Sequence, residues 1–504
     1  MQEKTSDLQT TELRPSSPPT LEVGDDESRS PRNWSPWKRR LLFISLMSSS
    51  ILADGGMVWG ATLIVDQALD WGISVDKSAT TMNYGLLLQG IGGLMAIPLI
   101  EAYGRLPVWL WPQFITTFMV LGATLSNNYD AFTAFRSLQG LFGTVPQVVG
   151  LPIIHDMYDP KDWPHMINIW GTTFLIGPFL GPAIAGYIGA GSNWKISFGM
   201  LTLFYGLSTI LIFLFGHETY FVKGRECQRN TRIQAIFGIK NHNLPVFPTV
   251  ALWTKTLVVY IFKFPLLLTG IATMVNFCWP IGITVTASTF VAQPPYLFDT
   301  VQSSSLRWAP IIGGLTGFSF GYYFNAWIYR SRQKNWQPEY RLHGVWFAIG
   351  TMAAGLLTYG LTLHFHRHWI GLAFGWGMVV AGMIASTVYV KRIAKPVQLA
   401  QNWEERLCTN ADICLYRSIT SYALEKYPDQ STVVSAIING WRTASGFSVG
   451  YFQPAWIAKD GLAAVFATQA GVVVAVLVLT IAPVIVVEGR RARAKGETAV
   501  VSSP

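Results

Sequence analysis

Long apolar stretches, separated by short polar segments, dominate the chain from residue 40 onwards. Most of them approach the roughly 20 residues that an α-helix needs to cross a hydrocarbon core about 30 Å thick. The pattern therefore predicts an all-α polytopic membrane protein with twelve transmembrane helices. The expected spans are residues 40–65, 79–101, 107–126, 131–155, 165–189, 194–215, 267–291, 306–328, 344–364, 369–390, 433–456 and 463–487.

Polar segments group these spans into two bundles of six helices. The expected regions are a disordered cytosolic tail (1–38), a first bundle (39–217), a basic cytosolic loop (218–256), a second bundle (257–487) and a cytosolic tail (488–504). The glycine pair Gly177 and Gly181 of the fifth span has the same spacing as Gly446 and Gly450 of the eleventh. Two six-helix halves with weak internal similarity are typical of secondary transporters.

Composition excludes an ordinary soluble enzyme. Half of the 504 residues are apolar and 13% are charged, against about 25% charged residues in an average soluble domain. The net charge of +9 does not indicate nucleic-acid binding, because 30 of the 37 Lys and Arg residues fall on one side of the expected topology. By the positive-inside rule this side is the cytosol, where both termini then lie. We expect the plasma membrane, since no organelle signal stands at the C-terminus.

Three motifs in the first bundle combine glycine with charged residues or proline. They consist of Glu101, Gly104 and Arg105 after the second span, Arg136, Gly140 and Gly143 in the fourth, and Gly177, Pro178, Gly181 and Pro182 in the fifth. These motifs resemble those of the major facilitator superfamily, and specifically its fungal twelve-span drug:proton antiporter branch. The resemblance covers roughly residues 33–487. It implies a two-bundle fold and the efflux of a small organic molecule in exchange for protons.

Two of these motifs have physical readings of their own. Glu101 and Arg105 form a candidate gating latch with Gly104, although a surface ion pair worth under about 1 kcal/mol is the alternative. In the fifth span, glycines allow close helix approach and prolines bend the helix. The span can therefore seal and rock, or it can simply be kinked.

Three ionisable residues stand out inside spans, where such residues are costly and usually face a cavity. They are Asp54 in the first span, Arg136 in the fourth and Arg442 in the eleventh. Asp54 is the candidate proton or cation site, because it is the carboxylate nearest the middle of a span. The alternatives are a structural partner of Arg136 and a residue near a water-exposed end.

Polar and aromatic residues inside several spans are candidates for lining a substrate cavity. Flat organic molecules suit such a lining, although each residue can equally be an interface anchor or a packing residue. The candidates are Trp59, Asn83, Gln89, Gln147, Trp170, Asn276, Trp279, Trp376, Asn439 and Trp441.

The sequence has no recognisable catalytic or cofactor-binding motif, which favours a transporter over an enzyme. No phosphate-binding loop for ATP is present, and the run His364, His366 and His368 lies in an expected outer loop without acidic partners. We therefore expect no metal, no cofactor, and a proton gradient as the driving force. The expected partners of a monomeric protein are a small-molecule substrate and the lipid bilayer. The alternatives are proton-coupled uptake of a cation or metabolite, such as a polyamine, and an integral membrane enzyme.

Residues 389–417 lengthen a loop that is expected to be short. The codons of Val388–Val390 permit a splice donor, those of Thr409 and Asn410 a branch point, and those of Tyr416 and Arg417 an acceptor. The segment is therefore read as a retained intron, with a genuine cytosolic insertion as the alternative.

Overall fold

The computed structural model describes residues 30–159, 162–220, 231–239, 246–331, 344–386 and 430–501. Every regular element within these ranges is a helix, and each predicted span overlaps one long helix or consecutive helices. Eight of the described helical segments are long and apolar enough to cross a membrane. The predicted all-α membrane fold class is confirmed. The segment 389–417 lies outside the described residues.

Within the described residues, the first half contains nine α-helices and three short 3-10 helices. Its elements are η1 (Pro31–Asn33), α2 (Pro36–Gly55), η2 (Trp59–Thr62), α3 (Ile64–Trp71), α4 (Val75–Ala79), η3 (Thr80–Met82), α5 (Asn83–Tyr103), α6 (Arg105–Leu125), α7 (Tyr129–Gly143), α8 (Val145–Met157), α9 (Trp163–Ala190) and α10 (Trp194–Phe215). Polar caps define several starts, because a side-chain oxygen satisfies a free N–H group there. Asn128, for example, accepts a hydrogen bond from Ala131 N at 2.9 Å.

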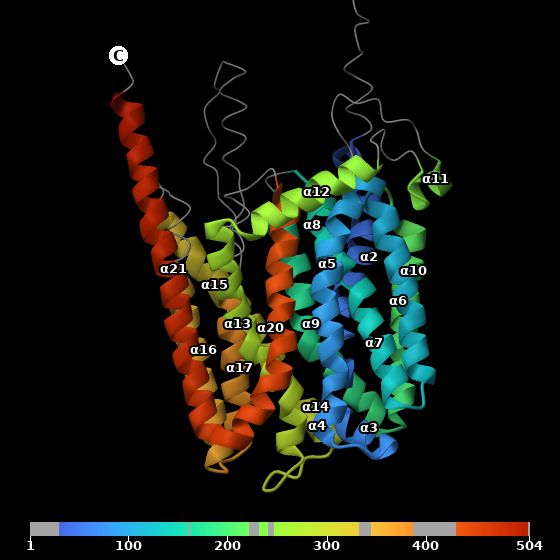
Figure 1. The fold of residues 1–504 in the computed structure, drawn as a ribbon, viewed down its shortest axis with the longest axis vertical. Helices are drawn as coiled ribbons and strands as arrows, with labels where there is room; N and C mark the ends of the chain where they lie inside the picture. The colour runs from blue at the N-terminus through green and yellow to red at the C-terminus, as the bar shows by residue number, and fades with distance from the viewer. Residues whose placement is uncertain are drawn as a thin grey trace, which may run out of the picture.

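The connection and the second half follow. Their elements are α11 (Arg232–Ile236), α12 (Val246–Ile261), α13 (Phe264–Val291), α14 (Thr300–Leu306), α15 (Trp308–Ser331), α16 (Gly344–His364), α17 (Ile370–Ala385), α20 (Ser431–Asp460) and α21 (Leu462–Val501). Figure 1 shows the first half, in blue to green, beside the second half, in yellow to red. Helix α12 lies across one end of the bundle and α14 lies at the other. We name the two ends by these helices.

The two halves touch along several helix pairs. Helix α20 of the second half packs against α5 and α8 of the first, and α14 and α15 pack against α9. Gly90 of α5 permits one of these approaches, because a Cβ atom there would stand only 2.5 Å from Thr443 Oγ1 of α20. The halves are therefore in close contact along these helix pairs.

Three features differ from the sequence expectations. Helix α12 begins inside the basic loop expected over 218–256 and ends beyond it at Ile261, and its apolar residues Leu252, Val258 and Val259 are exposed. The C-terminal tail expected from residue 488 continues α21 as far as Val501, in a segment rich in good helix formers. The first span is not one helix, and its break builds the candidate site.

Candidate functional site

The first span is interrupted near its middle, immediately after Asp54. Helix α2 ends at Gly55, and regular structure resumes at Trp59. Two consecutive glycines, Gly55 and Gly56, explain the end of the helix, because glycine loses more conformational freedom than other residues when it becomes helical. The break leaves Asp54 in the last turn of α2, buried between the halves with 4% of its surface exposed.

Asp54 forms an ion pair with Arg442 of α20, which is itself 8% exposed. Arg442 Nη2 donates to Asp54 Oδ1 at 3.1 Å, and Nη1 donates to Oδ2. The pair is bidentate, a geometry that strengthens charged hydrogen bonds. It joins residues that are 388 positions apart in the chain, one from each half.

Three amide side chains surround the ion pair. Gln89 Nε2 of α5 donates to Asp54 Oδ1 at 2.6 Å, while Arg442 Nη2 donates to Gln147 Oε1 at 2.9 Å and to Asn439 Oδ1 at 2.8 Å. Four helices therefore meet at one polar cluster: α2, α5, α8 and α20. The predicted ion candidates Asp54 and Arg442 come together here with three of the ten cavity candidates.

The cluster faces a cavity of only about 20 Å³. Room for roughly one water molecule needs about 10–15 Å³, so this closed arrangement does not accommodate an organic molecule. Pro178 and Gly446 line the cavity, and the rings of Phe174 and Phe277 lie 5.5 and 5.6 Å from the Arg442 guanidinium carbon. Sequence reasoning missed both phenylalanines, since apolar aromatic residues are common in every span.

Arg136 is not the partner of Asp54. Its Nη1 donates to Gly56 O at 2.8 Å and its Nη2 to Met57 O, the carbonyls exposed by the break after α2. A cation at a helix C-terminus is favoured by the helix dipole. Within the described residues Arg136 has no carboxylate partner. Arg136 therefore stabilises the break, and the alternative of an Asp54–Arg136 pair does not match the structure. The other alternative, a water-exposed Asp54, fails because Asp54 is buried.

Arg307, between α14 and α15, is a third buried arginine that sequence reasoning missed. It is 1% exposed, although it is the second residue of the predicted span 306–328, where a charged side chain is expected to face water. Its Nη2 donates to Ala61 O of the first half at 3.2 Å, and its Nη1 donates to Thr284 O of the second half at 3.2 Å. Arg307 thus bridges the halves at the α14 end. Its position at the edge of a predicted span gave no signal of burial.

In the candidate latch, Arg105 is paired with a different acid from the one predicted. Arg105 forms an ion pair with Asp156 at the end of α8, and not with Glu101. Glu218 caps α6, accepting hydrogen bonds from the backbone N of Arg105 and of Leu106, both at 3.0 Å. These contacts connect α6 to α8 and to the segment after α10, all within the first half.

Gly104 is the residue of this motif whose conformation demands glycine. It connects α5 to α6 with a φ of 98°, where a side chain would be strained. The motif therefore sets a sharp turn at the α12 end.

The glycines of the fifth span act at a helix crossing. A Cβ atom on Gly177 would lie 3.1 Å from Gly55 N, and Gly181 also packs on the Gly55 backbone. Helix α9 therefore touches α2 directly beside Asp54. Pro178 and Pro182 lie inside an α9 that continues from Trp163 to Ala190, and Thr62 Oγ1 donates to Pro182 O at 2.8 Å.

The other seven cavity candidates lie apart from the Asp54 cluster. Three of them donate hydrogen bonds to serine hydroxyls: Trp59 to Ser197 Oγ, Trp170 to Ser50 Oγ and Asn276 to Ser386 Oγ. Two lie against glycines, Asn83 against Gly450 and Trp441 against Gly270. The last two lie beside other large side chains, Trp279 beside Phe452 and Trp376 beside Arg307. Most therefore pack helices together, which was the alternative reading. Among the described residues, no group of three His, Cys, Asp or Glu side chains is placed to hold a metal ion.

Known proteins are similar to this chain in sequence and fold. MFS-type transporter kojT of Aspergillus flavus is 29% identical over 199 residues, which cover 39% of this chain and 35% of that protein. Efflux pump radE of Floropilus chiversii is 26% identical over 388 residues, which cover 71% of this chain and 69% of that pump. The chain thus matches about a third of the length of kojT.

The fold has counterparts among solved structures. The crystal structure of peptide transporter POT in complex with sulfate matches with a TM-score of 0.58 at 15% identity, covering 92% of this chain and 98% of that one. A sequence profile described as Major Facilitator Superfamily matches residues 42–395, which is more than half of the chain. The two-half helical fold, the fungal transporter relatives and the profile match together establish that the chain belongs to the Major Facilitator Superfamily, a family of membrane transporters rather than enzymes.

Proposed function

We propose that this secondary transporter is driven by protons and exports a small organic molecule, with Asp54 as the proton-coupling residue. The observation that carries the proposal is the buried ion pair between Asp54 and Arg442, because it joins the two halves. In alternating access, the halves separate on one side at a time around a central site. A titratable contact between them is a means of linking proton binding to that movement.

The proposed coupling step is the protonation of the Asp54 carboxylate. A neutral Asp54 attracts the Arg442 guanidinium less, so the contact between α2 and α20 weakens. Arg442 still has Gln147 and Asn439 as hydrogen-bond acceptors, which lowers the cost of losing its counter-ion. Separation of the halves then enlarges a cavity that is too small for substrate in the closed arrangement.

Direction and placement form part of the same proposal. Export is supported by the relative radE, which is known as an efflux pump. The excess of Lys and Arg on one side supports cytosolic termini, with the α12 end facing the cytosol. The protein acts as a monomer in the plasma membrane and needs no cofactor besides the proton gradient.

Transport measurements in cells with and without the gene test this function. The probes are radiolabelled organic acids, organic bases and a polyamine, with the pH gradient imposed in either direction. Export predicts lower accumulation of at least one probe in expressing cells when the outside is acidic, and loss of this difference with a protonophore. Higher accumulation would favour uptake, and a difference unaffected by the gradient would contradict proton coupling.

A further inference from the structure

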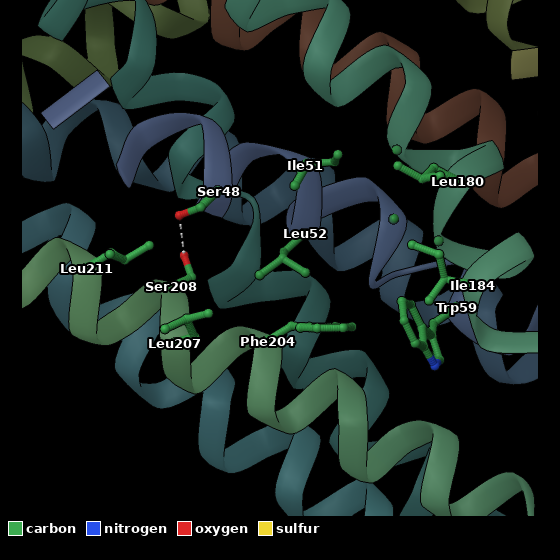
Figure 2. Close-up of a pocket in the computed structure, with 13 residues that line it drawn as sticks. Ser48, Ile51, Leu52, Trp59, Leu180, Ile184, Phe204, Leu207, Ser208 and Leu211 are labelled. Carbon is green, nitrogen blue, oxygen red and sulfur yellow. Dashed lines mark hydrogen bonds between the residues drawn. The ribbon is translucent and has the colours of Figure 1, made fainter. Parts of the chain in front are cut away.

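A second and larger cavity lies on the far side of the α2–α9 contact from the Asp54 cluster. Its volume is about 260 Å³, and its lining residues come from α2, η2, α9 and α10. Figure 2 shows Ile51 and Leu52 of α2, Leu180 of α9, and Phe204 and Leu207 of α10 around this space. Nothing in the proposed transport mechanism uses this cavity.

The polar side chains at its edges already have partners. Ser48 and Ser208 are hydrogen-bonded to each other at 3.0 Å, as Figure 2 shows. Trp59 Nε1 donates to Ser197 Oγ at 3.0 Å. The remaining lining side chains are aliphatic or aromatic, and the other lining residues are glycines. A polar ligand or headgroup would therefore find no free hydrogen-bonding side chain, so the occupant is apolar.

The size of the cavity points to a chain rather than to water. An apolar cavity of about 150 Å³ stays dry and accepts a molecule as large as benzene. This cavity is larger and equally apolar. It therefore suits a hydrocarbon segment longer than one aromatic ring.

The cavity borders a helix face that is surrounded by hydrocarbon. Leu203, Leu207 and Ile210 of α10 are 64%, 57% and 55% exposed. The helix has a mean hydropathy of 2.0, and only a third of its apolar segment is buried inside the protein. In a membrane, lipid tails solvate such a face. They are thus the apolar molecules with direct access to the cavity.

One wall of the cavity is the contact between α2 and α9 that lies beside Asp54. Gly55 and Gly177 line this cavity, whereas their chain neighbours Asp54 and Pro178 line the small central one. A Cβ atom on Gly177 would lie 3.6 Å from Asp54 Cβ. The two cavities therefore lie on either side of the contact between α2 and α9.

We propose that this cavity binds one acyl chain of a bilayer lipid, which packs against the Gly55–Gly177 contact and steadies α2 against α9. The site is distinct from the substrate site, and its existence does not depend on proton coupling or on the direction of transport.

Photo-crosslinking tests the proposal directly. The full-length protein is reconstituted in phosphatidylcholine vesicles that contain a phosphatidylcholine with a diazirine in one acyl chain. Adducts are then mapped by mass spectrometry. We expect several-fold more adducts on residues 48–52 and 204–211 than on the lipid-exposed face of α21 around Leu479, which is 69% exposed. Equal adduct density on both surfaces would overturn the proposal.

A matched pair of variants separates the cavity from the surrounding lipid. Leu207→Trp fills the cavity, whereas Leu203→Trp adds the same ring one turn away on the same helix, outside the lining. Leu207→Trp should reduce the adducts on residues 48–52 several-fold, and Leu203→Trp should leave them unchanged. If Leu207→Trp does not elute as a monodisperse protein, Ile184→Phe fills the cavity from α9 instead. Unchanged crosslinking in the filled variant would refute the site, whatever the outcome of transport assays.

Discussion

Two buried arginines connect the halves of this transporter, and their partners differ in kind. Arg442 binds a carboxylate, Asp54, near the middle of the molecule, whereas Arg307 binds the carbonyls of Ala61 and Thr284 at the α14 end. A carboxylate can accept a proton and lose its charge, but a backbone carbonyl cannot at any physiological pH. Under the proposed mechanism, a proton releases the central contact directly, while the contact at the α14 end opens in response to other movements.

The largest effect is expected when the titratable group of the central contact is removed. Asp54→Asn keeps the size of the side chain and its hydrogen bond from Gln89, but it cannot gain or lose a proton. We expect the variant to insert in the membrane and to lose transport driven by a pH gradient entirely. Flux in proteoliposomes with an imposed gradient measures this. Full transport by Asp54→Asn would remove Asp54 from the mechanism.

The next largest effect concerns stability. Arg442→Ala leaves Asp54 as a buried charge without its ion-pair partner, and breaking a buried pair in this way costs about 3–5 kcal/mol. We expect a marked fall in the melting temperature of the detergent-purified protein. The double variant Asp54→Ala with Arg442→Ala should be more stable than Arg442→Ala alone. If the two changes simply add, the pair is not coupled as the structure indicates.

Much of the pair could be anticipated from the chain, and part of it could not. Asp54 and Arg442 are conspicuous because charged residues inside apolar spans are rare. Their pairing was not predictable, because it depends on how helices 388 residues apart are aligned when the halves pack. Asp54 and Arg136 are closer in the sequence, yet the break after Gly55 turns carbonyls, not the carboxylate, towards Arg136.

Residues at the ends of the spans were harder to predict than the spans themselves. The spans were predictable from hydropathy, since twelve apolar stretches map onto described helices. Arg307 and Asp156 lie at span ends, where charged residues usually face water. Nothing in the sequence therefore indicated that Arg307 is buried or that Asp156 is paired. Helix α12 was missed because it is apolar but too short to span, and a basic loop was expected around it.

Removal of the Arg307 contact at the α14 end should have an intermediate effect. Arg307→Met removes its hydrogen bonds to Ala61 O and Thr284 O, and hydrogen bonds from charged donors are worth about 1.5–3 kcal/mol each. We expect the α14 end to open more often. Ser304→Cys, buried in the native protein, reports this opening through labelling by a membrane-impermeant maleimide in a background without native cysteines.

Labelling of Ser304→Cys should rise several-fold with Arg307→Met and stay unchanged with Lys459→Met, which neutralises a basic residue at the end of α20. In the Asp54→Asn background, where the central contact cannot respond to protons, the rise should be the same in acidic and in mildly alkaline buffer. A rise that depends on pH would show that this contact also senses protons, which would erase the distinction between the two arginines.

The smallest effect is expected within one half, away from both contacts. Gly104→Ala forces a side chain into a φ of 98°, and such strain costs about 1–3 kcal/mol. We expect a modest fall in melting temperature. Gly191→Ala is the matched control, because nothing lies within 4 Å of its Cβ position and its φ is −91°. Equal melting temperatures for the two variants would contradict the role assigned to Gly104.

The most direct test of the central claim needs no substrate. Spin labels at Trp37, at the start of α2, and at Phe264, at the start of α13, are both exposed and report the distance between the halves at the α12 end. Electron paramagnetic resonance should show a distance distribution that changes between mildly alkaline and acidic buffer in the native sequence. In Asp54→Asn the distribution should be the same at both pH values and should match that of the native protein in acid. A pH response that survives in Asp54→Asn would contradict the claim that the Asp54–Arg442 pair couples protons to the movement of the halves.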